Sequence, residues 1–288
     1  MNQIFILWLI CIFKLINHKS IEMKQFKTLL FLLLVPVYTF SQVFDIEQVK
    51  VNPSMMGDYE KFEGMWANAH EEIHKIGNKI GWFLFKVVPN SNQPKPGFDY
   101  VILNFYKDAE ARKAGWGVKN FQTLMKKANY GKIKSSEVKR LSSLGGKIKS
   151  EVKGYSLSVL DATIEVGSGP AIGNRVTYHG VKALNDDYEN YEMKWFKDGH
   201  NQDIIEGRRL AWYFNKVDSS TDNADKSMTH VIFERFNPSA PQREAFEPTF
   251  EQQMMWKHGG ASREFIENAT KELGGSLDCI VRSALSER

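Results

Sequence analysis

The chain has 288 residues, of which 42% are hydrophobic and 25% charged, so it can bury the core of one or two globular domains. Its two cysteines, Cys11 and Cys279, exclude a scaffold held together by several disulfides. Four lysines against one glutamate give residues 1–41 a net charge of +3 out of +4 for the chain. The remainder carries about +1, so we expect no nucleic-acid partner.

The first 42 residues have the pattern of an export signal. A basic segment begins at Met23, an apolar run of ten residues follows at 29–38, and small residues precede a cleavage point before Gln42. Ten apolar residues are too few to span a bilayer as a helix. Because another apolar run, 4–13, comes first, we hypothesise that translation starts at Met23; the alternative is a membrane anchor within 1–38. We expect 1–42 to be a leader and the mature protein to be periplasmic or secreted.

The rest of the chain contains an internal repeat. The segment 81–87, GWFLFKV, matches 211–217, AWYFNKV, and the same offset of 130 pairs His70 with His200. One inserted residue in the second copy shifts the offset to 129 where Trp66 pairs with Trp195. Self-similarity at a fixed spacing indicates duplicated structural units. The sequence therefore predicts two repeats, 43–167 and 171–288, joined by a Gly- and Pro-containing linker.

Each copy reads as strand, helix, strand, strand, helix, strand. In the first helix the apolar residues recur every three or four positions, and Gly77 follows as a C-cap. The expected strands of the first copy are 43–51, 82–88, 98–106 and 155–166, with helices at 57–77 and within 108–153. The expected strands of the second copy are 174–183, 210–217, 228–236 and 276–285, with helices at 186–206 and 245–273.

This order is the ferredoxin-like unit, a four-stranded sheet with helices on one face. The strands 82–88 and 98–106 are apolar on both faces, which predicts burial on both sides. The fold class expected is therefore α+β, with two tandem ferredoxin-like βαββαβ repeats packed sheet to sheet as a pseudo-dimeric α+β barrel.

This tandem plan resembles the dimeric α+β-barrel superfamily, which includes cofactor-free monooxygenases, haem-binding proteins and many uncharacterised members. The residues that carry the resemblance are Trp66 and His70, the turn from Gly77 to Trp82, and their counterparts in the second copy, Trp195, His200 and 207–212. The resemblance covers nearly all of 43–288 and implies the architecture alone. The region 108–153 departs from the short second helix usual in such units. Because two copies share one chain, we expect a monomer.

The motif His70-Glu-Glu-Ile-His74 could bind zinc, with Glu71 as the base of a hydrolase. Three observations oppose it. Ile80 stands where a third histidine would follow, the second copy lacks both the glutamate and the second histidine, and Glu71 points about 140° away from the apolar stripe of its helix. A zinc hydrolase is the weakest of three hypotheses, and the alternative is a charged helix surface.

Polar residues retained in an apolar setting form the other candidate site. His70 and His200 each follow a tryptophan on the first helix of their copy. Each histidine is either a polar group that contacts a ligand in a pocket or a half-buried histidine with a structural hydrogen bond. Asn104 and Glu234 are polar positions on central strands. Glu234 is either an acid or base with a raised pKa or the partner of Arg208 or Arg209. The ligand-binding candidates are Trp66, His70, Trp82, Tyr100, Asn104, Trp195, His200, Trp212, His230 and Glu234, and the catalytic candidates are His70, His200 and Glu234.

These features leave the function open between classes. The first hypothesis is a non-catalytic envelope protein that binds a small, mostly apolar molecule between sheet and helices. The second is a cofactor-free monooxygenase-like enzyme that moves protons with His and Glu. No nucleotide-binding or dinucleotide-binding glycine motif is present, so no cofactor is expected. The stretch 119–153 has a net charge of +8 and is either a surface for an anionic envelope partner or a solvated helix face. Met254-Met255-Trp256 is read as core rather than as a ligand box.

Overall fold

The computed structural model describes residues 42–90, 94–167, 169–240, 252 and 270–286, and these residues belong to one compact unit. The leader up to residue 41, the segment 254–256, and residues 245–251 and 253–269 of the helix expected at 245–273 lie outside the described residues. In the described part of the chain, no helix is long and apolar enough to cross a membrane.

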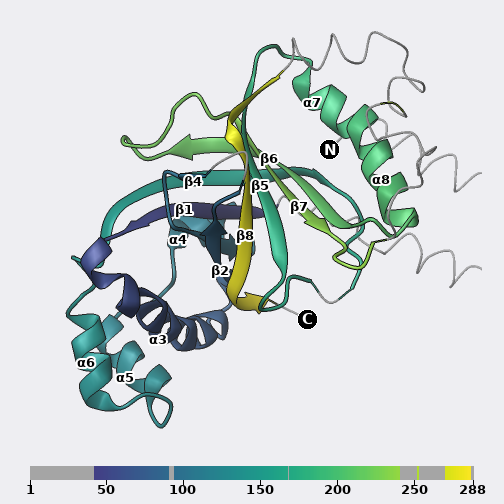
Figure 1. Cartoon of the computed structure of the whole chain (residues 1–288). Coiled ribbons are helices and arrows are strands. Elements are labelled where there is room, and N and C mark those ends of the chain that lie inside the picture. The colour runs from purple at the N-terminus through teal and green to yellow at the C-terminus, as the bar shows by residue number, and fades with distance from the viewer. Residues whose placement is uncertain (1–41, 91–93, 168, 241–251, 253–269, 287–288) are drawn as a thin grey trace, which may run out of the picture. The chain divides into compact units, whose positions relative to one another are not determined.

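Eight described strands, all paired antiparallel, close into one barrel (Figure 1). The order around the barrel is β1-β3-β2-β8-β5-β7-β6-β4. The strands are β1 (Val43–Val51), β2 (Lys79–Val88), β3 (Tyr100–Tyr106), β4 (Lys149–Ala162), β5 (Arg175–Ala183), β6 (Arg209–Ser220), β7 (His230–Phe236) and β8 (Thr270–Ser286).

Strands β1–β4 form one half of the barrel and β5–β8 the other. Within the first half the strands lie in the order β4-β1-β3-β2, and within the second in the matching order β8-β5-β7-β6. The halves are joined along two seams, where β2 pairs with β8 and β4 with β6. The inner faces of the two sheets therefore face each other inside a barrel whose edges are also hydrogen-bonded.

Apolar side chains from both halves fill the interior of the barrel. Alternate residues of each strand point inward, as the period of two in a strand requires. Phe44 of β1 stacks on Phe105 at 4.8 Å between ring centroids and contacts Phe233 of β7 at 6.4 Å. Among the described residues this interior is the largest apolar cluster, and it includes Leu103, Leu157, Tyr178 and Val231.

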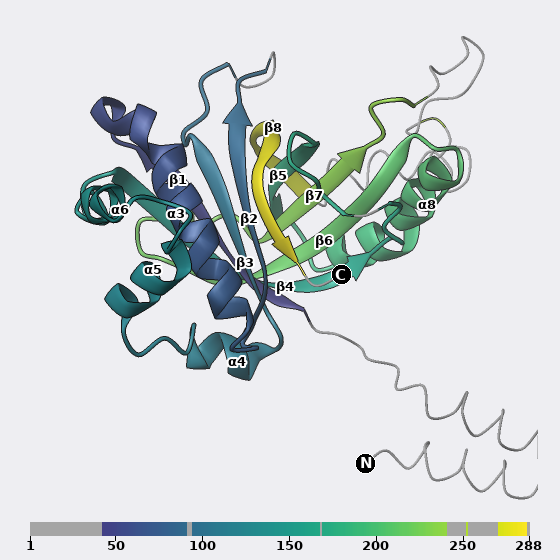
Figure 2. The same ribbon diagram turned by 90° about the horizontal axis from the view of Figure 1, so that it is seen from below.

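Helices cover the outer face of the first half. Helix α3 (Met56–His74) follows a short 3-10 turn, η1 (Pro53–Met55), and lies along the sheet, with α5 (Phe121–Asn129) and α6 (Ser135–Ser142) packed beside it (Figure 2). Helix α4 (Ala109–Ala114) precedes them. The region expected to be helical up to 153 instead enters β4 at Lys149. That part of the strand is rich in Lys, Ser and Glu and partly exposed, so it lacks the apolar signal of a buried strand.

The basic stretch 119–153 pairs with the acidic side of α3. Four of its cations form ion pairs there: Lys127 with Glu72, Lys132 with Glu71, Arg140 with Asp58 and Lys149 with Glu63. Much of the charge that the sequence concentrates here is thus neutralised within the chain. An anionic partner for the stretch stays a prediction.

In the second half, α7 (Tyr188–Tyr191), the π-helical segment η2 (Glu192–Phe196) and α8 (Lys197–Ile205) form one continuous run, where a single helix is expected. Figure 2 shows α8 on the side of the barrel opposite α3. The described apolar contacts beneath this run involve Tyr188, Trp212 and Phe214.

The predicted helix 245–273 is wrong at its end. Residues 270–273 lie in β8 and pair with Gly180–Ala183 of β5. The residues Thr-Lys-Glu-Leu at 270–273 have helix-compatible local propensity. Pairing with a neighbouring strand overrides that preference.

Candidate functional site

Each half contains a buried histidine whose ring packs against a tryptophan between helix and sheet. The rings of His70 and Trp82 lie 4.6 Å apart, and those of His200 and Trp212 lie 4.8 Å apart. Both imidazoles are nearly inaccessible, with 3% of His70 and 6% of His200 exposed. Burial lowers the pKa of His70 to about 2 and that of His200 to about 3, with the nearby cations Lys79 and Arg209 adding to the effect. Both side chains are therefore neutral at physiological pH.

Around His70 the polar contacts of the first half are satisfied within the protein. The Lys79 Nζ atom lies 3.0 Å from His70 Nδ1 and donates to Asn104 Oδ1, while Asn104 Nδ2 donates to Glu47 at 3.3 Å. Burial lowers the pKa of Lys79 to about 7, against the opposing charges of Glu47 and Asp45. Asn104 thus has a structural partner on each side, which explains a polar residue on this strand.

Aromatic rings close the first-half cluster on the helix side. Trp66 contacts Trp116 at 5.8 Å and Phe121 at 6.1 Å, and Lys79 lies over the ring of Trp116 at 4.8 Å.

The remaining candidate of this half, Tyr100, lies at the opposite end of β3. Its ring contacts Tyr59 at 4.5 Å, and its hydroxyl donates to Glu60 at 3.0 Å. The structure thus brings Trp66, His70, Trp82 and Asn104 together and leaves Tyr100 apart.

The second half carries charged residues at the matching positions. Arg209 stands where Lys79 stands, Glu234 where Asn104 stands, and His179 where Glu47 stands. Glu234 forms an ion pair with Arg209, and its Oε2 atom lies 2.9 Å from His179 Nε2. Arg209 also pairs with Asp203 at 3.4 Å.

These contacts reverse the pKa shift expected for Glu234. Burial raises the pKa of this carboxyl, but the hydrogen bond from His179 and the charge of Arg209 outweigh burial and lower the pKa to about 2. Glu234 is therefore ionised at neutral pH, in contrast to the raised pKa expected for an acid or base. The alternative expectation of pairing with Arg209 is what the structure shows.

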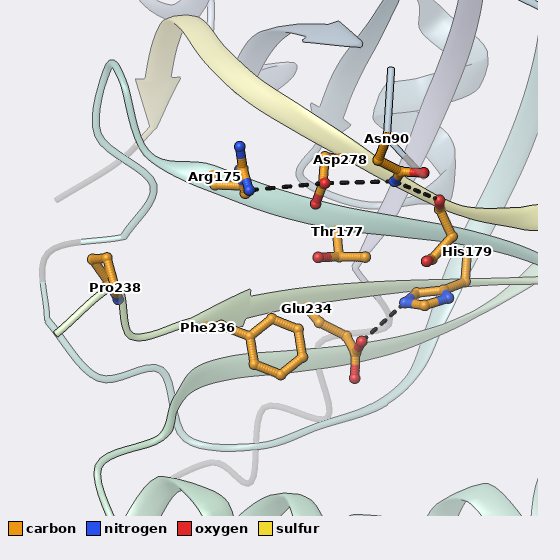
Figure 3. Close-up of a pocket in the computed structure, with 9 residues that line it drawn as sticks. Asn90, Arg175, Thr177, His179, Glu234, Phe236, Pro238 and Asp278 are labelled. Atoms are coloured by element: carbon orange, nitrogen blue, oxygen red, sulfur yellow. Dashed lines mark hydrogen bonds and ion pairs between the residues drawn. The ribbon is translucent and has the colours of Figure 1, made fainter. Parts of the chain in front are cut away.

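A cavity of about 620 Å³ lies beside this ion pair (Figure 3). His179 on β5 and Glu234 on β7 point into it, and Thr177 lies next to them. Arg175 and Asn90 contact Asp278 at one side, with distances of 3.8 and 3.5 Å. The described lining residues are Asn90, Arg175, Thr177, His179, Glu234, Phe236, Pro238, Ser276 and Asp278. Seven of the described lining residues have polar or charged side chains, while Phe236 and Pro238 are apolar.

The other second-half candidates lie outside the described cavity lining. His230 stacks on Phe214 at 5.1 Å between ring centroids and contacts Glu189 at 3.3 Å. Trp195 contacts Tyr191 at 5.0 Å. His200 on α8 packs against Trp212 of β6 at 4.8 Å between ring centroids.

The sequence analysis missed His179 and two buried glutamates. His179 alternates with the inward-facing Tyr178 on β5, and that alternation was the available signal. Glu63 and Glu192 are buried at matching positions on the first helix of each half, with 2% and 7% exposed. They share the offset of 129 that links Trp66 to Trp195, so the repeat itself could have identified them.

The geometry of the His70–His74 motif does not favour a zinc site. His70 Nδ1 faces the Lys79 ammonium group, and Glu71 is exposed and pairs with Lys132 at 2.6 Å. Within the residues that the structure describes, no group of three His, Cys, Asp or Glu side chains could hold a metal ion.

No protein-family model matches this chain, and no curated protein matches it in sequence. Among solved structures, it is similar to a protein named as a candidate monooxygenase from Fusobacterium nucleatum, with 9% identity and a TM-score of 0.50 over 86% of this chain and 96% of that one. An anthrone oxidase-like protein has 10% identity and a TM-score of 0.48 over 86% and 94%. A second candidate monooxygenase, from Lactobacillus acidophilus, has 10% identity and a TM-score of 0.47 over 85% and 96%.

The fold is shared with the Fusobacterium protein and is a mixed α+β fold built, in the part of the chain that the structure describes, on an eight-stranded antiparallel barrel. At 9% identity the likeness concerns architecture alone.

Proposed function

We propose that this protein binds a small organic molecule in the cavity that His179 and Glu234 line. The observation that carries the proposal is the 2.9 Å contact between His179 Nε2 and Glu234 Oε2, two side chains that line a cavity of about 620 Å³. Isolated buried charges are costly, so charged groups that line a cavity are well placed to bond a polar ligand group.

The lining indicates the kind of molecule. Phe236 is 47% exposed and, with Pro238, offers an apolar surface to a flat part of the ligand. Arg175, Thr177 and Asp278 supply hydrogen-bonding groups on another side. The ligand therefore combines an apolar face with at least one hydrogen-bonding group.

The proposal includes the organisation expected from the sequence. The two halves are tandem ferredoxin-like repeats, residues 1–42 direct export to the periplasm or outside, and the protein acts as a monomer. The matching strand orders support the first point, and the closure of the barrel within one chain supports the last.

Native mass spectrometry of gently purified protein tests ligand binding. We expect a non-covalent organic adduct on the wild-type chain and its loss in Thr177→Trp, because the indole fills the cavity. Thr123→Trp on the exposed surface of α5 is the matched control and should keep the adduct. Equal adducts in all three proteins would place the ligand elsewhere and refute the proposal.

A second candidate function is favoured by the 2.9 Å contact between His179 Nε2 and Glu234. An ionised carboxylate orients an imidazole and makes it a better proton acceptor. The pair could remove a proton from an acidic O–H or C–H group of a bound molecule. A cofactor-free oxygenase needs such a step before dioxygen reacts with the substrate anion, which agrees with the name of the Fusobacterium protein.

The absorbance of para-nitrophenol tests the proton transfer, because the phenol and the phenolate absorb differently. We expect binding to the wild-type protein to increase the phenolate fraction relative to free probe at the same pH. His179→Gln should bind the probe without that increase. An unchanged phenolate fraction on the wild-type protein would rule out the base, while binding itself would still support the ligand site.

A further inference from the structure

An exposed surface of the first half mixes large hydrophobic side chains with lysines. Ile76 is 49% exposed, Phe121 45% and Tyr130 88%. Ile76 lies two residues after α3, Phe121 begins α5, which packs beside α3 (Figure 2), and Tyr130 is the residue after α5. Exposed lysines of the same segments complete what we call the basic surface: Lys75, Lys119, Lys126, Lys127, Lys132 and Lys134.

Ion pairs fasten the end of α5 to the end of α3. Glu72 of α3 pairs with Lys127 of α5 at 2.6 Å, and its neighbour Glu71 pairs with Lys132 at 2.6 Å. Tyr130 lies between these two lysines in the chain. Its exposed ring is therefore held close to the last turn of α3, with a lysine on each side.

The other two hydrophobic side chains reach the same region through the loop between α4 and α5. Gly117 lies against Ile76, since a Cβ atom at position 117 would be 3.2 Å from Ile76 Cγ2. The preceding residue, Trp116, contacts Phe121 at 5.9 Å between ring centroids and Trp66 of α3 at 5.8 Å. All three exposed hydrophobic side chains thus lie beside the C-terminal half of α3.

The basic surface keeps an excess of positive charge. Its six lysines and the two glutamates 71 and 72 give a net charge of +4, whereas residues 42–288 together carry about +1. The remainder of that segment therefore carries about −3. Within the part of the chain that the structure describes, Lys119, Lys126 and Lys134 form no ion pair, so their charges are available to a partner.

This combination of side chains favours an anionic lipid surface over a soluble polyanion. Lysines next to an anionic bilayer are attracted by its surface potential, and tyrosine rings are enriched at the level of the headgroups, where one end of the ring is apolar and the other wet. A soluble polyanion would engage the lysines alone. Only the lipid surface also accounts for the exposed ring of Tyr130.

We propose that the basic surface docks the protein on an anionic phospholipid bilayer, with Tyr130 at the level of the headgroups and the lysines against the phosphates. The docking is peripheral and uses the outer side of the first half. It is independent of the proposed ligand cavity, which lies in the second half and is tested separately.

Co-sedimentation with vesicles tests the docking. The anionic probe is a vesicle of phosphatidylglycerol mixed with phosphatidylcholine, and the neutral probe is a vesicle of phosphatidylcholine alone. We expect the wild-type protein to sediment with the anionic vesicles and to stay in solution with the neutral ones. The bound fraction should fall as salt is added, because salt screens charges at an exposed surface.

Removal of the three lysines without an ion pair should weaken this binding strongly. The variant Lys119→Gln/Lys126→Gln/Lys134→Gln should lose about 100-fold in affinity for the anionic vesicles, because each lysine near such a surface contributes about fivefold.

A matched variant removes the same charge from exposed lysines outside the basic surface, and it should keep most of the affinity: Lys61→Gln/Lys95→Gln/Lys194→Gln. Equal weakening in both triple variants would assign the binding to the net charge of the chain and would overturn the proposal.

The tyrosine separates a bilayer from a soluble polyanion. Tyr130→Ser should bind the anionic vesicles about tenfold more weakly, because the ring no longer enters the interface. Ile164→Ser, at a side chain that is 81% exposed outside the basic surface, should bind as the wild type does. Affinity that survives Tyr130→Ser unchanged would indicate a site for polyanions, and failure of the wild type to sediment would exclude docking; either result would overturn the proposal.

Discussion

Lys79 and Arg209 occupy the same place in the two halves, 130 residues apart, and each contacts the polar side chain of the matching third strand. The lysine meets a neutral amide, Asn104, in a cluster covered by aromatic rings. The arginine meets an ionised carboxylate, Glu234, beside a cavity. One scaffold position therefore supports a closed polar core in one half and a charged site in the other.

The effects on stability of substituting Arg209 and Glu234, which form an ion pair in the second half, should depend strongly on each other. Arg209→Met leaves a buried carboxylate without its cation, so we expect a loss of about 3–5 kcal/mol in the free energy of unfolding at neutral pH. Urea denaturation measures it. The double variant Arg209→Met/Glu234→Gln should recover part of the loss, and strictly additive effects would contradict the coupling.

Lys79 should make the free energy of unfolding depend on pH in the neutral to alkaline range. Its pKa in the folded protein is about 7, below the usual lysine value of 10.5. Between these values the unfolded chain binds more protons, so the free energy of unfolding rises as pH increases from about 7 to about 10. Lys79→Met should lack this rise, while the exposed control Lys61→Met should keep it. Identical pH profiles for Lys79→Met and the wild type would contradict the lowered pKa.

Glu192 gives a dependence of the opposite sign at lower pH. Its pKa of about 7 in the folded protein exceeds the usual glutamate value of 4.5, so between these values the folded state binds more protons than the unfolded chain. The stability contributed by the protonated carboxyl is full below about 4.5 and is lost as pH rises through about 7, by about 2–3 kcal/mol. Thermal or urea unfolding of Glu192→Gln across this range should show a flatter profile. Equal losses of stability with rising pH in the wild type and in Glu192→Gln would contradict the raised pKa of Glu192.

The basic stretch 119–153 should contribute to the stability of the protein mainly through the buried contact of Lys149, and its exposed charges should contribute little. Lys149→Met removes the cation of Glu63, whose side chain is 3% exposed, and should cost about 3 kcal/mol. Lys134→Met changes an exposed lysine of the same stretch and should cost under about 0.5 kcal/mol. Comparable losses in both variants would show that the stretch acts as a whole.

Much of the fold could be predicted because its signals are local. Strand β1 runs from Val43 to Val51 as expected, and the offset of 130 located the paired histidines. The polar start of β4 and residues 270–273 of β8 were missed because strand pairing, a contact distant in sequence, decides them. The direction of the Glu234 pKa shift depended on which arginine and which histidine reach it, and only tertiary structure fixes that.

The two seams have a consequence for fragments of this protein. All eight described strands have a partner on each side, so this part of the chain presents no edge strand to other molecules. A half expressed alone would expose two open edges together with the apolar face that contains Phe44 or Phe233. Such a fragment would pair with a second copy of itself or aggregate, so the covalent link between the halves also protects the protein against self-association.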